Sequence, residues 1–121
     1  MSQRNVAVMP LYAAVSVAQA ATAYTSSSKF RLATGYAGIR LISTAGSITV
    51  SQQCSVDDII WYDPVDAAGN TLGTVCTSQG VTTGRYISYS PVLTSYIRFK
   101  IVEGNTAATT VTIDLIFQEE A

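Results

Sequence analysis

Apolar and polar residues alternate most clearly in two segments near the end of the chain, 96–103 and 109–118. A repeat of two is that of a β-strand with one buried face. The five residues between them, 104–108, include Gly and Asn, which suit the positive φ angle of a hairpin loop. The pattern therefore predicts an antiparallel hairpin, whose register places Arg98 opposite Asp114 on one face and apolar pairs on the other.

A second hairpin is predicted from residues 39–43 and 47–50, with Leu41 opposite Val50 across a turn at 45–46. From about Lys29 onward, turn residues recur every 8–12 positions, which is typical of a sandwich or barrel. Further short strands are predicted between these turns, at 23–32, 59–62, 75–77 and 85–90.

These elements predict an all-β fold, an antiparallel β-sandwich or jelly-roll with at most one short helix. Only residues 13–24 contain enough Ala to compete as a helix, and Val15 and Val17 favour a strand there because branched side chains are restricted in a helix. The apolar faces of the strands should form the core, centred on Leu41, Val50, Ile97, Phe99, Ile101, Val111, Ile113 and Leu115.

The N-terminal segment 1–20 precedes a single sandwich domain at 21–121. Arg4 and the apolar stretch after it resemble a signal peptide, but Pro10 and other residues interrupt the stretch. Because Pro has no N–H to donate in a central strand, we interpret the segment as an extended N-terminal arm or a docked edge strand. At roughly 3.3 Å per residue, such an arm is long enough to reach a neighbouring copy.

Composition narrows the classes of function. Ser and Thr supply 28 of the 121 residues, charged residues only 12%, and the net charge is −1. A surface of hydroxyl groups and Ala is poorly protected against association, so we expect copies of the chain or a larger assembly to cover it. The alternative is a secreted domain with an O-glycosylated surface. Neither nucleic acid nor a membrane is an expected partner, because there is no basic excess and no apolar run of roughly 20 residues.

No residue pattern indicates catalysis. The chain contains no His, the most common general base and metal ligand. None of the serines lies in a G-x-S-x-G motif, and Lys29 follows a run of serines in a predicted turn, not in a helix. The adjacent Asp57 and Asp58 are better explained as charges that discourage edge pairing than as a catalytic pair. We therefore expect no enzymatic activity.

Metals and cofactors are not expected either. Cys54 and Cys76 cannot complete a structural zinc site without further ligands. They are interpreted as small buried thiols, with a single disulfide as the alternative in an oxidising compartment. Asp63, Asp66 and Asn70 offer oxygen ligands for calcium, but their spacing does not match an EF-hand loop.

The aromatic residues are the one pattern with a binding mechanism. Seven Tyr and one Trp outnumber three Phe, and Tyr and Trp anchor protein interfaces and stack on sugars. Two tyrosines of the predicted strand 85–90 lie on opposite faces, so at least one should be exposed, whereas Trp61 is either a core residue or part of such a platform. The predicted interface combines this strand with the arm: Arg4, Val6, Val8, Leu11, Tyr12, Tyr86 and Tyr89.

Residues 29–118 resemble small β-sandwich virion proteins of tailed bacteriophages. The resemblance rests on the strand GYAGIRL, a TV-type strand after a turn, a D-x-x-G loop, the segment YSPVL before IRFKI, and a final TVTI strand. It implies a capsid decoration or cement protein, which is made in the host cytoplasm, forms homo-oligomers and binds the major capsid protein in the virion. It implies no catalytic residue and no cofactor, and the N-terminal arm lies outside it.

Two other functions fit the same residues. A receptor- or carbohydrate-binding module, from a tail fibre or a secreted enzyme, would use Trp61 and exposed tyrosines and would be monomeric. A major shell or tube subunit would assemble with its own copies. A decoration protein should instead cosediment with particles.

Overall fold

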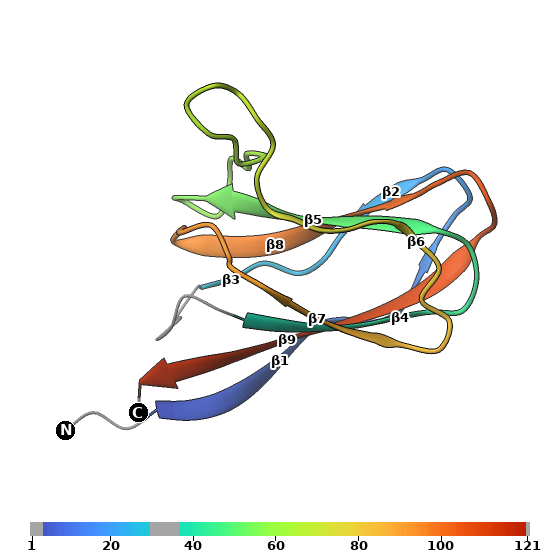
Figure 1. Ribbon diagram of the computed structural model, residues 1–121, viewed down its shortest axis with the longest axis horizontal. Coiled ribbons are helices and arrows are strands. Elements are labelled where there is room, and N and C mark those ends of the chain that lie inside the picture. Colours follow the sequence, from blue (N-terminus) through green and yellow to red (C-terminus); the bar gives the residue numbers. More distant parts are fainter. Residues whose placement is uncertain (1–3, 30–36, 121) are drawn as a thin grey trace.

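The computed structural model describes residues 4–29 and 37–120 and shows two antiparallel sheets packed face to face (Figure 1). The first sheet has four strands in the spatial order β1 (Arg4–Val17), β9 (Thr109–Glu120), β4 (Ala37–Ser43) and β7 (Arg85–Tyr89). The second has the order β2 (Thr22–Tyr24), β8 (Tyr96–Glu103), β5 (Ile48–Ser55) and β6 (Thr74–Gln79), and β3 (Ser28–Lys29) also pairs with β8. Among the described residues no helix is long and apolar enough to cross a membrane.

The order of the strands is that of a jelly-roll. The short strands β2 and β3 pair with opposite ends of β8, so together they fill one strand position. Every connection between strand positions crosses from one sheet to the other, except the one from β5 to β6. This alternation between two four-stranded sheets characterises the jelly-roll, and the predicted all-β sandwich fold is confirmed.

Both predicted hairpins are wrong in their pairing. Strands β8 and β9 lie in different sheets, and so do β4 and β5. Arg98 is opposite Gln53, and Asp114 is opposite Arg40, instead of each other. The alternation shows which side chains face the core, but a five-residue loop spans the roughly 10 Å between sheets as readily as it joins two neighbouring strands.

The predicted strand at 59–62 is also wrong, because the chain there forms a turn in a long loop between β5 and β6. The predicted strands at 75–77 and 85–90 correspond to β6 and β7. The predicted strand at 23–32 appears as β2 and β3, and its end lies outside the described residues.

The core lies between the sheets, and the prediction of its residues is confirmed. All eight predicted core residues have at most 1% of their surface exposed. They alternate along β4, β5, β8 and β9 with residues that point outward. Burial of these apolar faces is the main stabilising contribution to a sandwich of this size.

Strand β1 is the outer strand of the first sheet and pairs with β9 along most of its length, from Arg4 opposite Glu120 to Val17 opposite Thr109. The register shifts between Pro10 and Tyr12 and again after Tyr12. Such irregularities, together with Pro, are tolerated at a sheet edge, where one row of backbone groups has no partner strand.

Candidate functional site

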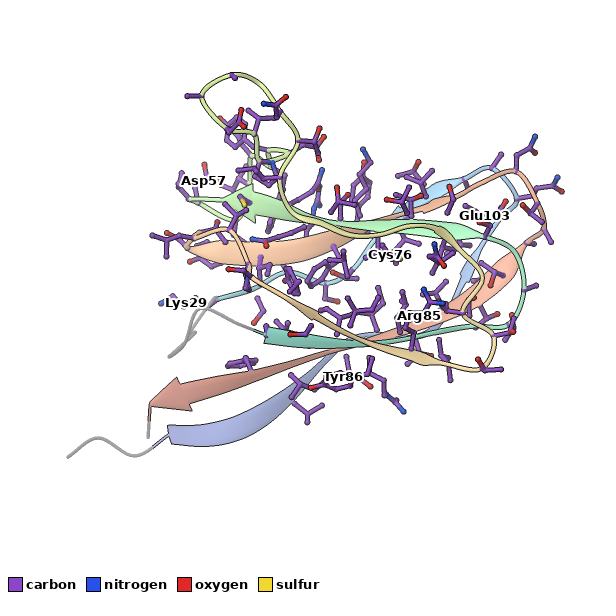
Figure 2. The ribbon with its side chains drawn as sticks, in the orientation of Figure 1. Lys29, Asp57, Cys76, Arg85, Tyr86 and Glu103 are labelled. Atoms are coloured by element: carbon purple, nitrogen blue, oxygen red, sulfur yellow. The ribbon has the colours of Figure 1, made fainter. Side chains whose placement is uncertain are left out.

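The outer face of the first sheet brings together two residues of the predicted interface, Val8 and Tyr86. Val8 lies opposite Ile116, and Ile116 lies opposite Gly38. Tyr86 is 63% exposed, and its ring covers Gly38, where any side chain would overlap it (Figure 2). This face therefore presents apolar side chains next to an aromatic ring.

An ion pair lies in the same face. Arg40 Nε donates to Asp114 Oδ2 at 2.7 Å, and Arg40 is opposite Tyr86 in the register. The arginine is exposed while the aspartate is buried, so the pair fixes a charged group in the middle of the sheet face. Because Arg40 remains largely in water, the pair contributes modestly to stability, and it places a positive charge beside the Tyr86 ring.

Other predicted interface residues are placed differently. Arg4, Val6, Leu11 and Tyr12 are positions of strand β1, where their backbone pairs with β9 or lies beside the bulge. Tyr89 points inward, and its ring meets Phe99 edge-on with 6.2 Å between centroids.

Burial raises the pKa of the Tyr89 hydroxyl, which has no hydrogen-bond partner among the described residues. The expectation that Tyr86 and Tyr89 lie on opposite faces is correct, and only Tyr86 is accessible to a partner.

A second surface, which the sequence did not indicate, is an apolar loop tip formed by Val56, Ile59, Ile60 and Leu93. Ile59 is 79% exposed and Leu93 is 94% exposed. The hydroxyl of Thr94 bonds to the backbone of Ser55, which joins the two loops that carry these side chains. Large exposed apolar side chains on two linked loops make the loop tip a candidate interaction site.

Hydrogen bonds within the turn keep the loop tip rigid. Asp57 Oδ1 accepts from the N–H groups of Ile59 and Ile60 at 3.0 Å each, and Ser55 Oγ accepts from those of Asp57 and Asp58. These donors hold the pKa of Asp57 below its ordinary value. Ser and Asp in this spacing are turn formers, and that signal outweighs the strand preference of the isoleucines.

On the outer face of the second sheet, Arg98 lies between two aromatic rings. Its guanidinium carbon is 4.2 Å from the centroid of Tyr24 and 4.5 Å from that of Trp61. Arg98 Nε also donates to Gln53 Oε1 at 2.8 Å. The stack fastens the long β5–β6 loop, which carries Trp61, to the strands beneath it.

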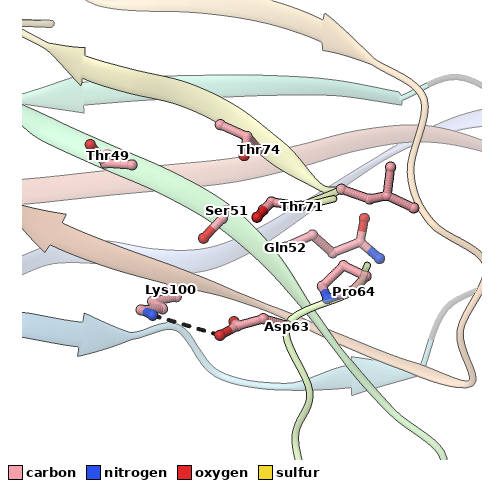
Figure 3. A pocket seen from close by; sticks show the side chains of 9 residues that line it. Thr49, Ser51, Gln52, Asp63, Pro64, Thr71, Thr74 and Lys100 are labelled. Carbon is pink, nitrogen blue, oxygen red and sulfur yellow. Dashed lines mark ion pairs between the residues drawn. The ribbon is translucent and has the colours of Figure 1, made fainter. Parts of the chain in front are cut away.

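A groove follows next to this stack, between the sheet and the loop (Figure 3). Gln53 Nε2 donates to Asp63 Oδ1 at 3.0 Å, and the other carboxylate oxygen faces Lys100 Nζ at 3.8 Å. The cavity has a volume of about 300 Å³, and four of the nine residues that line it carry a hydroxyl group. The sequence indicated Asp63 only as a candidate oxygen ligand for calcium. In the structure its carboxylate pairs with Lys100.

The acidic and thiol side chains of the described residues do not gather at one site. No group of three or more Cys, Asp or Glu is close enough to hold a metal ion in the part of the chain that the structure describes. Burial raises the pKa of the two thiols, Cys54 and Cys76, which are not bridged. The carboxylate of Asp66 accepts bonds from the backbone and side chain of Asn70, which lower its pKa and close the loop on itself.

Comparisons with known proteins give a likeness in structure and none in sequence. No protein-family model matches the chain, and no curated protein matches it in sequence. A structure of the Gx strain of infectious bursal disease virus is similar, with a TM-score of 0.47 and 11% identity over 96% of this chain. The chain spans about a third of that chain's length, 32%.

Proposed function

We propose that the protein is a non-catalytic structural protein of a virion, and in particular a decoration or cement protein on the outer surface of a phage head. The observation that carries the proposal is the loop tip, where large apolar side chains are held in water by a rigid turn. A jelly-roll with few charges and such a tip is suited to a permanent partner. The phage resemblance of the sequence supports the finer assignment.

In this proposal the two surfaces have different partners. The loop tip contacts the major capsid protein, because its exposed isoleucines need an apolar pocket. The outer face of the first sheet, with Val8 and Tyr86, contacts neighbouring copies, and strand β1 at its edge extends that contact. Repeated weak contacts on a symmetric shell add up to lasting attachment.

Deletion of residues 2–12 is a poor test of the proposal, because it removes most of the strand that pairs with β9. A sharper test replaces surface side chains only. The double variant Ile59→Ser, Ile60→Ser and the variant Tyr86→Ser are compared with the wild type for cosedimentation with virions from the native source.

The tip variant should lose particle binding by at least about 100-fold, since burying two isoleucines in the contact is worth about 1.5–3 kcal/mol each. Tyr86→Ser should instead weaken self-association, measured by analytical ultracentrifugation. A wild-type protein that neither cosediments nor self-associates contradicts the proposal.

The second candidate function is that of a carbohydrate-binding module, and the groove on the second sheet favours it. The groove beside Tyr24, Trp61 and Lys100 lies on the face opposite to the predicted copy contacts. The jelly-roll also occurs in lectins, so the fold admits both functions.

A further inference from the structure

The groove on the second sheet is built by three strands and one loop. Ser51 and Lys100 come from the central strands β5 and β8, where they lie opposite each other, Thr74 comes from β6, and Asp63 and Thr71 come from the long loop. A volume of about 300 Å³ lies at the lower end of the range typical of small-ligand sites, roughly 300–1,000 Å³.

The polar groups of the groove can bind several hydroxyl groups at once. The Lys100–Asp63 pair is loose, at 3.8 Å, and both side chains are partly exposed. Lys100 therefore keeps N–H groups that can donate, and Asp63 keeps an oxygen lone pair that can accept. The hydroxyl groups of Thr71 and Thr74 can donate as well as accept hydrogen bonds.

Apolar and aromatic surface borders these polar groups. Pro64 and Leu72 line the same groove. Tyr24 is directly opposite Lys100 in the register, and 45% of its surface is exposed. Arg98 covers the faces of the Tyr24 and Trp61 rings that are turned toward it, and neither of these two residues lines the groove itself.

We infer that this groove binds a neutral saccharide, and the inference does not depend on a virion role. A sugar offers adjacent hydroxyls for the polar groups and C–H faces for the apolar ones. The opposite charges of Asp63 and Lys100 cancel, so the groove does not select an anion. Its one carboxylate faces the ammonium group of Lys100, which disfavours a divalent cation at the same place.

The experiment begins with an array of neutral oligosaccharides of hexoses and N-acetylhexosamines, printed beside sialylated and sulfated ones. The best neutral ligand is then titrated into the wild type, Lys100→Met, Thr74→Val and Thr77→Val by heteronuclear NMR. Thr77 is exposed on the same strand as Thr74 but does not line the groove, so it is the matched control. The NMR spectra also report whether each variant is folded.

The expected result is a neutral ligand that shifts resonances of the groove residues. Lys100→Met should weaken its binding at least about tenfold and Thr74→Val about threefold or more, whereas Thr77→Val should bind like the wild type. The inference is overturned if no neutral sugar binds with a Kd below about 10 mM. It is equally overturned if only anionic glycans bind, or if folded Lys100→Met and Thr74→Val bind as the wild type does.

Discussion

Glu103 is a buried carboxylate, 2% exposed, that ties three connections of the fold together (Figure 2). Its oxygens accept from the N–H groups of Ala20 at 2.9 Å, Ser47 at 3.3 Å and Thr106 at 3.0 Å. These residues belong to the turns that follow β1, β4 and β8, each of which crosses between the sheets. The bond from Ala20, followed by those from Ser47 and Thr106, holds the pKa of Glu103 below its ordinary value.

Replacing Glu103 by Gln should lower the melting temperature at neutral pH, because an amide nitrogen then faces backbone N–H groups. A depressed carboxylate pKa stabilises the folded state above the unfolded pKa, and this contribution is lost as the pH falls through the folded pKa. The difference between wild type and Glu103→Gln should therefore shrink on acidification, in thermal melts from neutral pH to about pH 3. Asp66→Asn, in an exposed turn, should have a smaller effect at neutral pH. An unchanged melting temperature for Glu103→Gln contradicts this role.

The connections between sheets depend on close packing of the turns. Gly46, between β4 and β5, has φ of +72°, and a Cβ there would lie 2.8 Å from the carbonyl oxygen of Ala107 in the β8–β9 loop. Gly69 also has a positive φ, +86°, but has no atom within 4 Å of such a Cβ. Alanine substitutions at the two glycines therefore distinguish the cost of the left-handed backbone, which both share, from the cost of crowding between turns, which arises only at Gly46.

Gly69→Ala should cost about 1–2 kcal/mol from the left-handed backbone alone. Gly46→Ala should cost more, because the β4–β5 and β8–β9 turns must also move apart. Urea denaturation of the two variants measures the difference. Equal losses of unfolding free energy in the two variants would contradict this prediction, because they would mean that the turns accommodate the methyl group at Gly46 without cost.

Across the whole molecule, Phe99 joins the two sheets. It belongs to β8 of the second sheet, is fully buried, and meets Tyr89 of β7 in the first sheet. Because each sheet buries its apolar face only against the other, both should unfold in one transition.

Phe99→Ala should therefore lower the free energy of unfolding by about 3–5 kcal/mol. This is a large share of the total free energy of unfolding of a typical domain, which is roughly 5–15 kcal/mol. Urea denaturation followed by Trp61 fluorescence and by far-UV circular dichroism should give coincident curves. Leu93→Ala, in the exposed loop tip, should change stability by less than about 0.5 kcal/mol. Separate transitions for the two probes would show that the sheets fold independently.

The local pattern of the sequence was enough to identify the all-β class, the core residues from Leu41 to Leu115, and the opposite faces of Tyr86 and Tyr89, but not which of the two tyrosines is exposed. These follow from alternation, which acts between neighbouring residues and determines which face of a strand is buried. Partner strands depend on the whole chain, so the pairing of β8 with β5 instead of β9 appeared only in the folded molecule. For the same reason the groove was not visible in the sequence, because β5, β6, β8 and a long loop each supply part of it. The turn of the loop tip has a local cause, because Ser55 and Asp57 bend the chain where the isoleucines alone favour a strand. Only the link between this turn and the loop of Leu93, through Thr94, depended on the tertiary structure.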